Sequence, residues 1–470
     1  MKKIINFFVI LLSFSFTACK KFLVEHPKSI ASPQTVLNSV GGLDAALVGA
    51  YSNITGWSKM YSWDVLPLSE TFVDFQYGPY YGDFNDGNIL STSYTVNFAW
   101  SSLYKIISSA NIVLANIGNI ANDPNQNRIE GEAKFLRAWS YFDLVQFFGD
   151  VPLVLDPVND PSNFQPARTP QQDVYKQIVS DLQDAENKMN DVAPQPSRVN
   201  KWVAKAYLIK VYLTMAGNPN HITTFNGNST YALALAEAKD IINSGKYSIN
   251  IPYRDVFQTT GDAETIWELR CPDIILYNHF TFLSQGIFTP TDAFIKSFDA
   301  SDVRGPAWGI RTSYVSNGVT YTFPLPTYMK FVDSVQYAKG QQFQSTLSIT
   351  AIRLADVLLM AAEADNEVNS GPSSDAYSWI NAVRERAGIT DLSGLSQTDF
   401  RDSVFIERRK ELYGEGFDWM DLKRFHKFDL LNTTGRPFVT AIDDHLNYYP
   451  IYSGEITNNP NVTQNPGWPG

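Results

Sequence analysis

One segment, residues 132–154, restricts the fold more than any other part of the chain. Apolar side chains recur there at intervals of three and four residues, which is the spacing of one face of an α-helix. Gly149 then supplies the backbone freedom that helix ends require, and Pro152 prevents the helix from continuing. The segment therefore predicts an amphipathic helix with a defined carboxyl end. Its apolar positions are Phe135, Leu136, Trp139, Phe142, Leu144, Val145 and Phe148.

The rest of the chain is also typical of a mostly α protein. Outside residues 248–345, the alternation typical of strands is almost absent. Alanine-rich pairs, 201–208 with 231–238 and 353–364 with 376–388, have the mixture of small and aromatic residues found in tetratricopeptide hairpins. An irregular helical domain stays open, because the pairs are unevenly spaced. Periodic apolar faces predict helices at 33–54, 97–121, 126–148, 170–189, 200–216, 231–244, 351–369, 374–387 and 398–413.

The amino terminus has the pattern of a lipoprotein signal. Lys2 and Lys3 precede an apolar run, and the small residues Thr17 and Ala18 stand directly before Cys19. The run is shorter than the ~20 residues that a membrane-spanning helix needs. We therefore predict a signal peptide at 1–18, a lipid on Cys19, and one domain over 19–470, since no linker or low-complexity segment divides the chain.

Charge and cysteine content exclude several functions. The net charge is −11, which disfavours nucleic acid and anionic lipid headgroups as partners. With Cys19 acylated, Cys271 has no partner for a disulfide. The five histidines are scattered singly, and neither a zinc motif nor a complete nucleotide-binding loop is present. We therefore predict no metal site and no cofactor. Residues 83–87 partly match a calcium loop, but Tyr94 stands where a bidentate glutamate is required, so calcium stays open and is not predicted.

Five segments spread along the chain form a recognisable set: the Cys19 opening, 132–154, the helix at 353–364, a charged cluster at 407–424 and the tail at 447–468. Taken together, they resemble the SusD/RagB family, which comprises surface lipoproteins of Bacteroidetes-type bacteria that capture nutrients. The resemblance implies a right-handed superhelical scaffold, attachment to the outer membrane at the cell surface, and a SusC-like TonB-dependent transporter as partner. It also implies an architectural role for the cluster at 407–424, where we expect ion pairs at helical spacing around Glu407 and Glu411.

Two long excursions, 55–96 and 248–345, interrupt the helical pattern and are rich in aromatics, Gly, Pro and Asn. Loops carried by a rigid frame are common binding sites. Rings that pack on sugar faces, next to carboxylates and amides that bind hydroxyls, suit an oligosaccharide. Trp100 is excluded because it lies in a helical stripe with Tyr104, Ile107 and Asn111. The candidates are Trp57, Trp63, Tyr77, Tyr80, Tyr81, Asp83 and Asn85; the resemblance adds Tyr277 and Trp308 by region.

The sequence thus predicts a non-catalytic lipoprotein that binds an oligosaccharide and delivers it to the transporter. Three alternatives stay open. The first is a helical glycan-degrading lipoprotein, because Glu70, Asp74 and Asp83 could form a catalytic carboxylate pair. The second is a peptide-binding member of the same family, and the third is a tetratricopeptide-like adaptor for other proteins.

Overall fold

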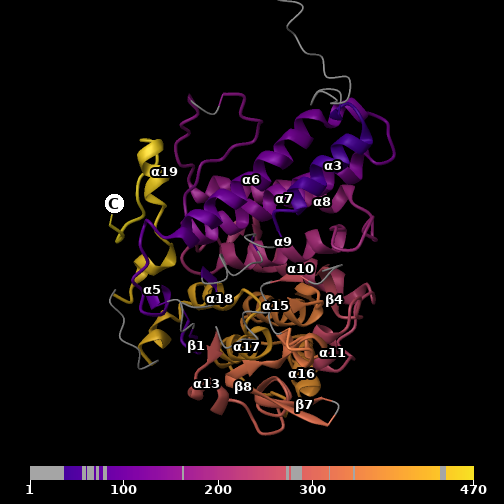
Figure 1. Cartoon of the computed structure of the whole chain (residues 1–470), viewed down its shortest axis with the longest axis vertical. Coiled ribbons are helices and arrows are strands. Elements are labelled where there is room, and N and C mark those ends of the chain that lie inside the picture. Colours follow the sequence, from indigo (N-terminus) through magenta and orange to yellow (C-terminus); the bar gives the residue numbers. More distant parts are fainter. Residues whose placement is uncertain are drawn as a thin grey trace, which may run out of the picture.

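A computed structural model shows the chain as a mostly helical molecule (Figure 1). It describes residues 36–54, 60, 68–69, 73–77, 82–160, 163–270, 275–276, 288–316, 318–341, 344–433 and 441–469.

Every long helix predicted from the apolar periodicity is present, most with ends shifted by a few residues. The helix predicted from residue 33 begins at Val40, and residues 33–35 lie outside the described part of the chain. The helix predicted from residue 97 begins earlier, at Tyr94, so the first excursion ends before 96. The long helices are α3 Val40–Tyr51, α6 Tyr94–Asn116, α7 Gln126–Phe148, α8 Gln171–Lys188, α9 Lys201–Ala216, α10 Thr230–Asn243, α15 Leu354–Val368, α16 Ser374–Ala387 and α17 Gln397–Leu412.

These helices pack in chain order, each against the next. α3 packs on α6, α6 on α7, and the series continues through α8, α9 and α10 to α15, which contacts both α16 and α17. Figure 1 shows the earlier helices in the upper part of the view and α15, α16 and α17 below them. The prediction of a mostly α, tetratricopeptide-like fold is confirmed. Among the helices in the described ranges, none is long and apolar enough to cross a bilayer.

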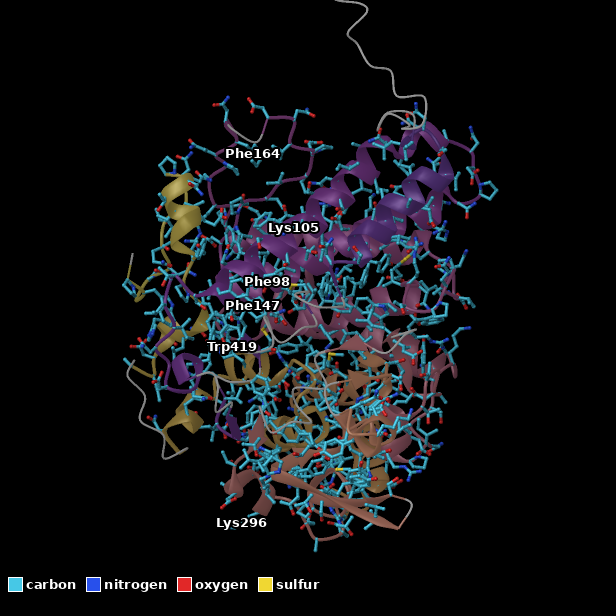
Figure 2. All side chains as sticks on the ribbon, viewed as in Figure 1. Phe98, Lys105, Phe147, Phe164, Lys296 and Trp419 are labelled. Atoms are coloured by element: carbon cyan, nitrogen blue, oxygen red, sulfur yellow. The ribbon has the colours of Figure 1, made fainter. Side chains whose placement is uncertain are left out.

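Helix α7 is the centre of the core and is buried on nearly every side. At its end, Phe147 stacks on Trp419 of α18 (Asp418–Arg424), with 6.2 Å between ring centroids (Figure 2). Gly149 takes a φ of 70° and closes the helix onto Val145, as its sequence position predicted. The Tyr104 hydroxyl then donates to the Pro152 carbonyl at 2.8 Å. The stripe containing Trp100 is therefore structural, as expected.

The strands are short and form antiparallel pairs. β4 (Thr265–Leu269) pairs with β10 (Ile349–Arg353), and β7 (Ile310–Ser316) forms a hairpin with β8 (Val319–Tyr328). β1 (Gln76–Tyr77) pairs with β6 (Thr289–Pro290), so the two excursions meet in space although about two hundred residues separate them in sequence. The remaining pairs are β2 (Thr224–Phe225) with β3 (Asn228–Ser229), and β5 (Ile275–Leu276) with β9 (Gln344–Ser345).

Short helices also occur inside the excursions. They are α5 Gly82–Asn85, α11 Tyr253–Gln258, α13 Asp292–Lys296 and α14 Ser334–Ala338, and α19 Ser453–Asn458 lies near the carboxyl end. The second excursion is therefore more regular than predicted. Figure 1 shows α13, β7 and β8 at the bottom of the view, below α15 and α17, and α11 at the right, level with α17.

Candidate ligand-binding site

Most of the candidate residues predicted from the sequence cannot be placed. Trp57, Trp63, Tyr80, Tyr81 and Tyr277 lie outside the described residues, and so do Cys19 and Glu70. Tyr77 lies in β1 and Asp83 in α5, and the structure describes only their backbones. Asn85 is the last residue of α5 and is half-buried. Trp308 is half-buried in the second excursion.

Backbone and side-chain contacts join the two excursions beside β1. Gln76 pairs with Pro290 across the strands, and the Gln76 side chain accepts a hydrogen bond of 2.6 Å from the Tyr328 hydroxyl at the end of β8. The rings of Phe75 and Phe294 stack with centroids 4.4 Å apart. The first excursion is therefore anchored against the base of the β7–β8 hairpin.

Some residues of the first excursion serve packing. Phe75 and Phe84 are 2% and 4% exposed and belong to the core. The Asp74 carboxylate pairs with the Arg409 guanidinium at 2.5 Å and is nearly buried, which leaves it poorly suited to act as a solvated acid or base. Phe75 and Phe84 are therefore packing residues of the first excursion rather than ligand contacts.

Trp308 is presented by a tight turn before β7. The Trp308 amide donates to the Gly305 carbonyl at 3.2 Å, and the Gly309 amide donates to the Val303 carbonyl at 2.8 Å. A Cβ atom on Gly309 would lie 1.9 Å from the Arg304 carbonyl oxygen, so only glycine fits at this position. The Trp308 ring meets the Tyr253 ring of α11 edge to face at 6.0 Å. Its position is thus set on two sides.

Trp308 lines a cavity of about 430 Å³ between α11, β7 and residues 329–334. This is large enough for part of a small-molecule ligand. The described residues that line it combine one large ring with hydroxyl, amide and guanidinium groups and include no carboxylate. Its lining includes the polar or aromatic side chains of Arg254, Gln258, Trp308, Arg311, Ser313 and Tyr314.

Tyr314 ties one wall of the cavity to the aromatic surface of the hairpin. Its ring stacks on Tyr321 and Phe323, with centroids 5.1 and 5.7 Å away, and meets Tyr337 edge to face. Its hydroxyl donates to the Ser334 carbonyl at 3.3 Å. Burial raises the pKa of Tyr314 to about 12, so the phenol stays neutral in ordinary buffers. This wall is built from neutral, stacked rings.

A buried ion network lies beneath the Trp308 turn. Arg304 pairs with Asp302 at 2.8 Å, with Glu407 at 2.5 Å and with Glu411 at 3.2 Å. Glu411 also pairs with Arg353 at 2.5 Å and with Arg386. The expected structural role of Glu407 and Glu411 fits these contacts. Their partners, however, come from β10, α16 and the 302–304 turn, rather than from the same helix at helical spacing.

Sequence reasoning missed Arg254, Arg311 and Tyr314. One signal was available: Asn317–Gly318 between β-rich runs is a strong predictor of a two-residue hairpin, and it would have placed Arg311 and Tyr314 on a strand beside Trp308. Gly318 indeed has a φ of 75° between the paired residues Ser316 and Val319. The position of Arg254 depends on the packing of α11, which no local pattern reveals.

A larger cavity, of about 800 Å³, lies between α6, residues 152–166 and α19. It contains none of the predicted site residues, and Tyr104 and Asn111 on its floor are hydrogen-bonded to the 152–154 backbone. Figure 2 shows Phe164, which lines it, at the opposite end of the view from Lys296 of α13. Among the residues that the structure describes, no cluster of His, Cys, Asp or Glu could hold a metal ion.

Comparisons with known proteins agree with the resemblance seen in the sequence. A family model described as the SusD family matches residues 305–468, and one described as starch-binding, associating with outer membrane, matches residues 21–213. The SusD-like protein P25 of Formosa agariphila is 29% identical, over 93% of this chain and 94% of that protein. The starch-binding protein SusD of Bacteroides thetaiotaomicron is 24% identical, over 74% of each.

The fold is similar to that of a solved SusD superfamily protein from Parabacteroides distasonis. The TM-score is 0.80 at 25% sequence identity, over 93% of this chain and all of that one. Two family models that match different parts of the chain, relatives aligned along nearly its whole length, and the shared fold all agree. The chain therefore belongs to the SusD-like family.

Proposed function

We propose that this protein is a non-catalytic surface lipoprotein that binds an oligosaccharide and delivers it to a SusC-like TonB-dependent outer-membrane transporter. The observation that carries the binding role is the half-buried Trp308 ring on the wall of a cavity with several hydrogen-bonding side chains. An indole face packs well against the C–H groups of a sugar ring, while hydroxyl and amide groups bind its hydroxyls. The starch-binding description of one matching family model supports the ligand class.

We propose that the first excursion contributes further contacts to this site. Because β1 pairs with β6 beside the hairpin, Tyr77 belongs to the strand that joins the two excursions. We retain Trp57, Trp63, Tyr77, Tyr80, Tyr81, Asp83, Asn85 and Tyr277 as proposed ligand contacts.

Calorimetry with the chain lacking residues 1–18, run against a panel of oligosaccharides, tests the proposal. We expect binding to at least one glycan, and Trp308→Ala should weaken it by about tenfold or more, which corresponds to ~1.4 kcal/mol. Trp379→Ala is the matched control, because Trp379 is also half-buried but lies on α16 and does not line the cavity. Release of reducing ends from any glycan would instead favour a hydrolase, and peptide binding without glycan binding would favour the peptide alternative.

Membrane attachment is tested separately. We propose that Cys19 carries a lipid that holds the protein at the outer membrane, as the family description of outer-membrane association supports. Cys19→Ala should move the protein from the membrane fraction to the soluble envelope fraction without changing its thermal unfolding. Unchanged membrane fractionation would contradict the anchor. Co-purification with a SusC-like barrel from the native cell tests the partner.

A further inference from the structure

We infer that the Trp308 cavity selects an acidic glycan, and that Arg254 and Arg311 recognise its carboxylate or sulfate groups. This inference rests on the proposed function and adds that the ligand is negatively charged. The chain carries a net charge of −11, yet the described residues lining this cavity include two arginines and no carboxylate.

Arg311 is held in place without being neutralised. Its Nη1 atom donates to the carbonyl oxygens of Pro306 and Ala307, at 3.2 and 3.1 Å. Within the described part of the chain, its Nε and Nη2 atoms have no hydrogen-bond or ion-pair partner. The backbone thus orients the guanidinium and leaves the other donors of its fork for a ligand.

Arg254 is only weakly engaged by the protein. Its Nε atom lies 3.1 Å from the carboxylate of the adjacent Asp255, and its side chain is 64% exposed. Ion pairs this exposed contribute little, because water competes for both partners. The Nη atoms of Arg254, on the first turns of α11, can therefore turn to an anion in the cavity at little cost.

Asp333 adjoins the cavity lining in sequence, and its carboxylate is already hydrogen-bonded within the protein. Asp333 lies between two lining residues, Val332 and Ser334, but its carboxylate accepts hydrogen bonds from the amides of Val335 and Gln336 and from both the amide and the hydroxyl of Thr346. It caps the amino end of α14 and is 7% exposed. No described carboxylate is therefore placed to neutralise Arg311.

The chemistry of these groups favours a charged sugar. A guanidinium fork matches the oxygen pair of a carboxylate or a sulfate and binds it more strongly than it binds neutral hydroxyls. Trp308 supplies a ring for the sugar face in the same cavity. Uronic-acid and sulfated glycans combine both features, and the arginines bind them through the same donors.

The test compares matched probes that differ only in charge. The first pair is a galacturonic-acid hexamer and its carboxyl-reduced form, and the second is a sulfated galactan oligosaccharide and its desulfated form. In calorimetry we expect at least one acidic probe to bind the parent protein about tenfold or more tightly than its neutral counterpart, with affinity falling as salt rises. Which pair shows the effect distinguishes carboxylate from sulfate.

The double variant Arg254→Gln/Arg311→Gln should lose that preference and bind the acidic and neutral probes within a factor of about three. Arg401→Gln is the control, since Arg401 is 38% exposed, pairs with Glu367 and lies on α17 away from the cavity. Arg311→Lys keeps the charge but removes the fork, and should show an intermediate preference; it also serves if the double variant fails to fold.

Equal or tighter binding of the neutral probes by the parent would overturn the inference and leave the proposed function standing, provided Trp308→Ala still weakens that binding. A double variant that folds and keeps the acidic preference would also overturn it. Absence of binding to every probe and every glycan of the panel would overturn the inference and the proposed function together.

Discussion

Arginines occupy two contrasting places in this molecule. Beneath the Trp308 turn, Arg304 and Arg353 are at most 1% exposed and each pairs with two or more carboxylates. Around the nearby cavity, Arg254 and Arg311 are exposed, and among the described residues their polar partners are the adjacent Asp255 and two backbone carbonyls. A buried charge must be paired, whereas water can solvate an exposed one. The first set belongs to the fold, and the second is available to a ligand.

The buried ion network also joins the segments that lie next to the cavity. Arg353 at the end of β10 binds Glu264 before β4, Glu411 on α17 and Glu415 after it. Arg304 connects the same α17 carboxylates to the turn that carries Trp308. Distant segments are thereby held in one arrangement beneath the proposed site, so the site and its support can be perturbed separately.

The largest effect on stability is expected from disrupting the buried ion network at Glu411. Burial opposes its ionisation, but Arg386, Arg353 and Arg304 outweigh burial and hold the pKa of Glu411 well below its usual range. Glu411→Gln leaves these arginines without their shared partner and should lower the free energy of unfolding by ~3–5 kcal/mol. Urea denaturation measures this, with Glu385→Gln on the exposed side of α16 as a control. Glycan affinity per folded molecule should stay unchanged; selective loss of binding with normal stability would assign Glu411 to the site.

The same pairing predicts acid sensitivity. A carboxyl group whose pKa is lowered by folding stabilises the native state above its unfolded pKa, near 4.5, and that stabilisation is lost as the pH falls further. The parent protein should therefore lose stability steeply below about pH 4.5, and Glu411→Gln should flatten this part of the profile. Parallel profiles for the two proteins would contradict the assignment.

Asp143 on α7 provides the opposite case, a half-buried carboxylate for which the described residues supply no arginine partner. It lines a cavity of about 110 Å³. Burial raises its pKa to about 7, against partial attraction by Lys210. Because the raised pKa favours the protonated folded state, stability should fall as the pH rises from about 4 to above 7. Asp143→Asn should therefore raise the free energy of unfolding by about 2 kcal/mol near pH 8, and by less near pH 5.

Thermal or urea unfolding at the two pH values checks this prediction. Asp391→Asn, at an exposed loop position, is the control and should change stability equally little at both. Destabilisation by Asp143→Asn near pH 8 would show that the charged carboxylate contributes to the native packing, and the contrast with Glu411 would then fail.

The helical scaffold was predictable because its signals are local. Apolar spacing marked α7, and Gly149 and Pro152 marked its exit, since these depend on residues close in sequence. The ion pairs of Glu407 and Glu411 were predicted in kind but with the wrong partners. Their arginines lie up to about a hundred residues away and meet only through tertiary packing.

The candidate site was predictable only in part, because tertiary packing also decides which residues meet there. Trp308 was found through the resemblance, whereas Arg254 reaches the same cavity because α11 packs beside the hairpin. Among the aromatics of the first excursion, composition could not separate Phe75 and Phe84, which are core, from the rings proposed as ligand contacts. Burial is a property of the folded chain, and a single loop sequence does not encode it.

The smallest effect on stability is expected for the double variant at Arg254 and Arg311, and it tests directly whether the two arginine sets differ in role. Arg254→Gln/Arg311→Gln removes two exposed charges, neither of which forms a buried ion pair with a described carboxylate. Substitutions at such exposed positions usually change the free energy of unfolding by less than ~0.5 kcal/mol. Urea denaturation should therefore give nearly the same midpoint and slope for the double variant and the parent, in contrast to the loss predicted for Glu411→Gln. Because the glycan experiment expects the same variant to lose its acidic preference, the two measurements together separate a recognition role from a structural one. A loss of more than about 2 kcal/mol would show that these arginines hold the hairpin to α11, and would move them into the same class as Arg304 and Arg353.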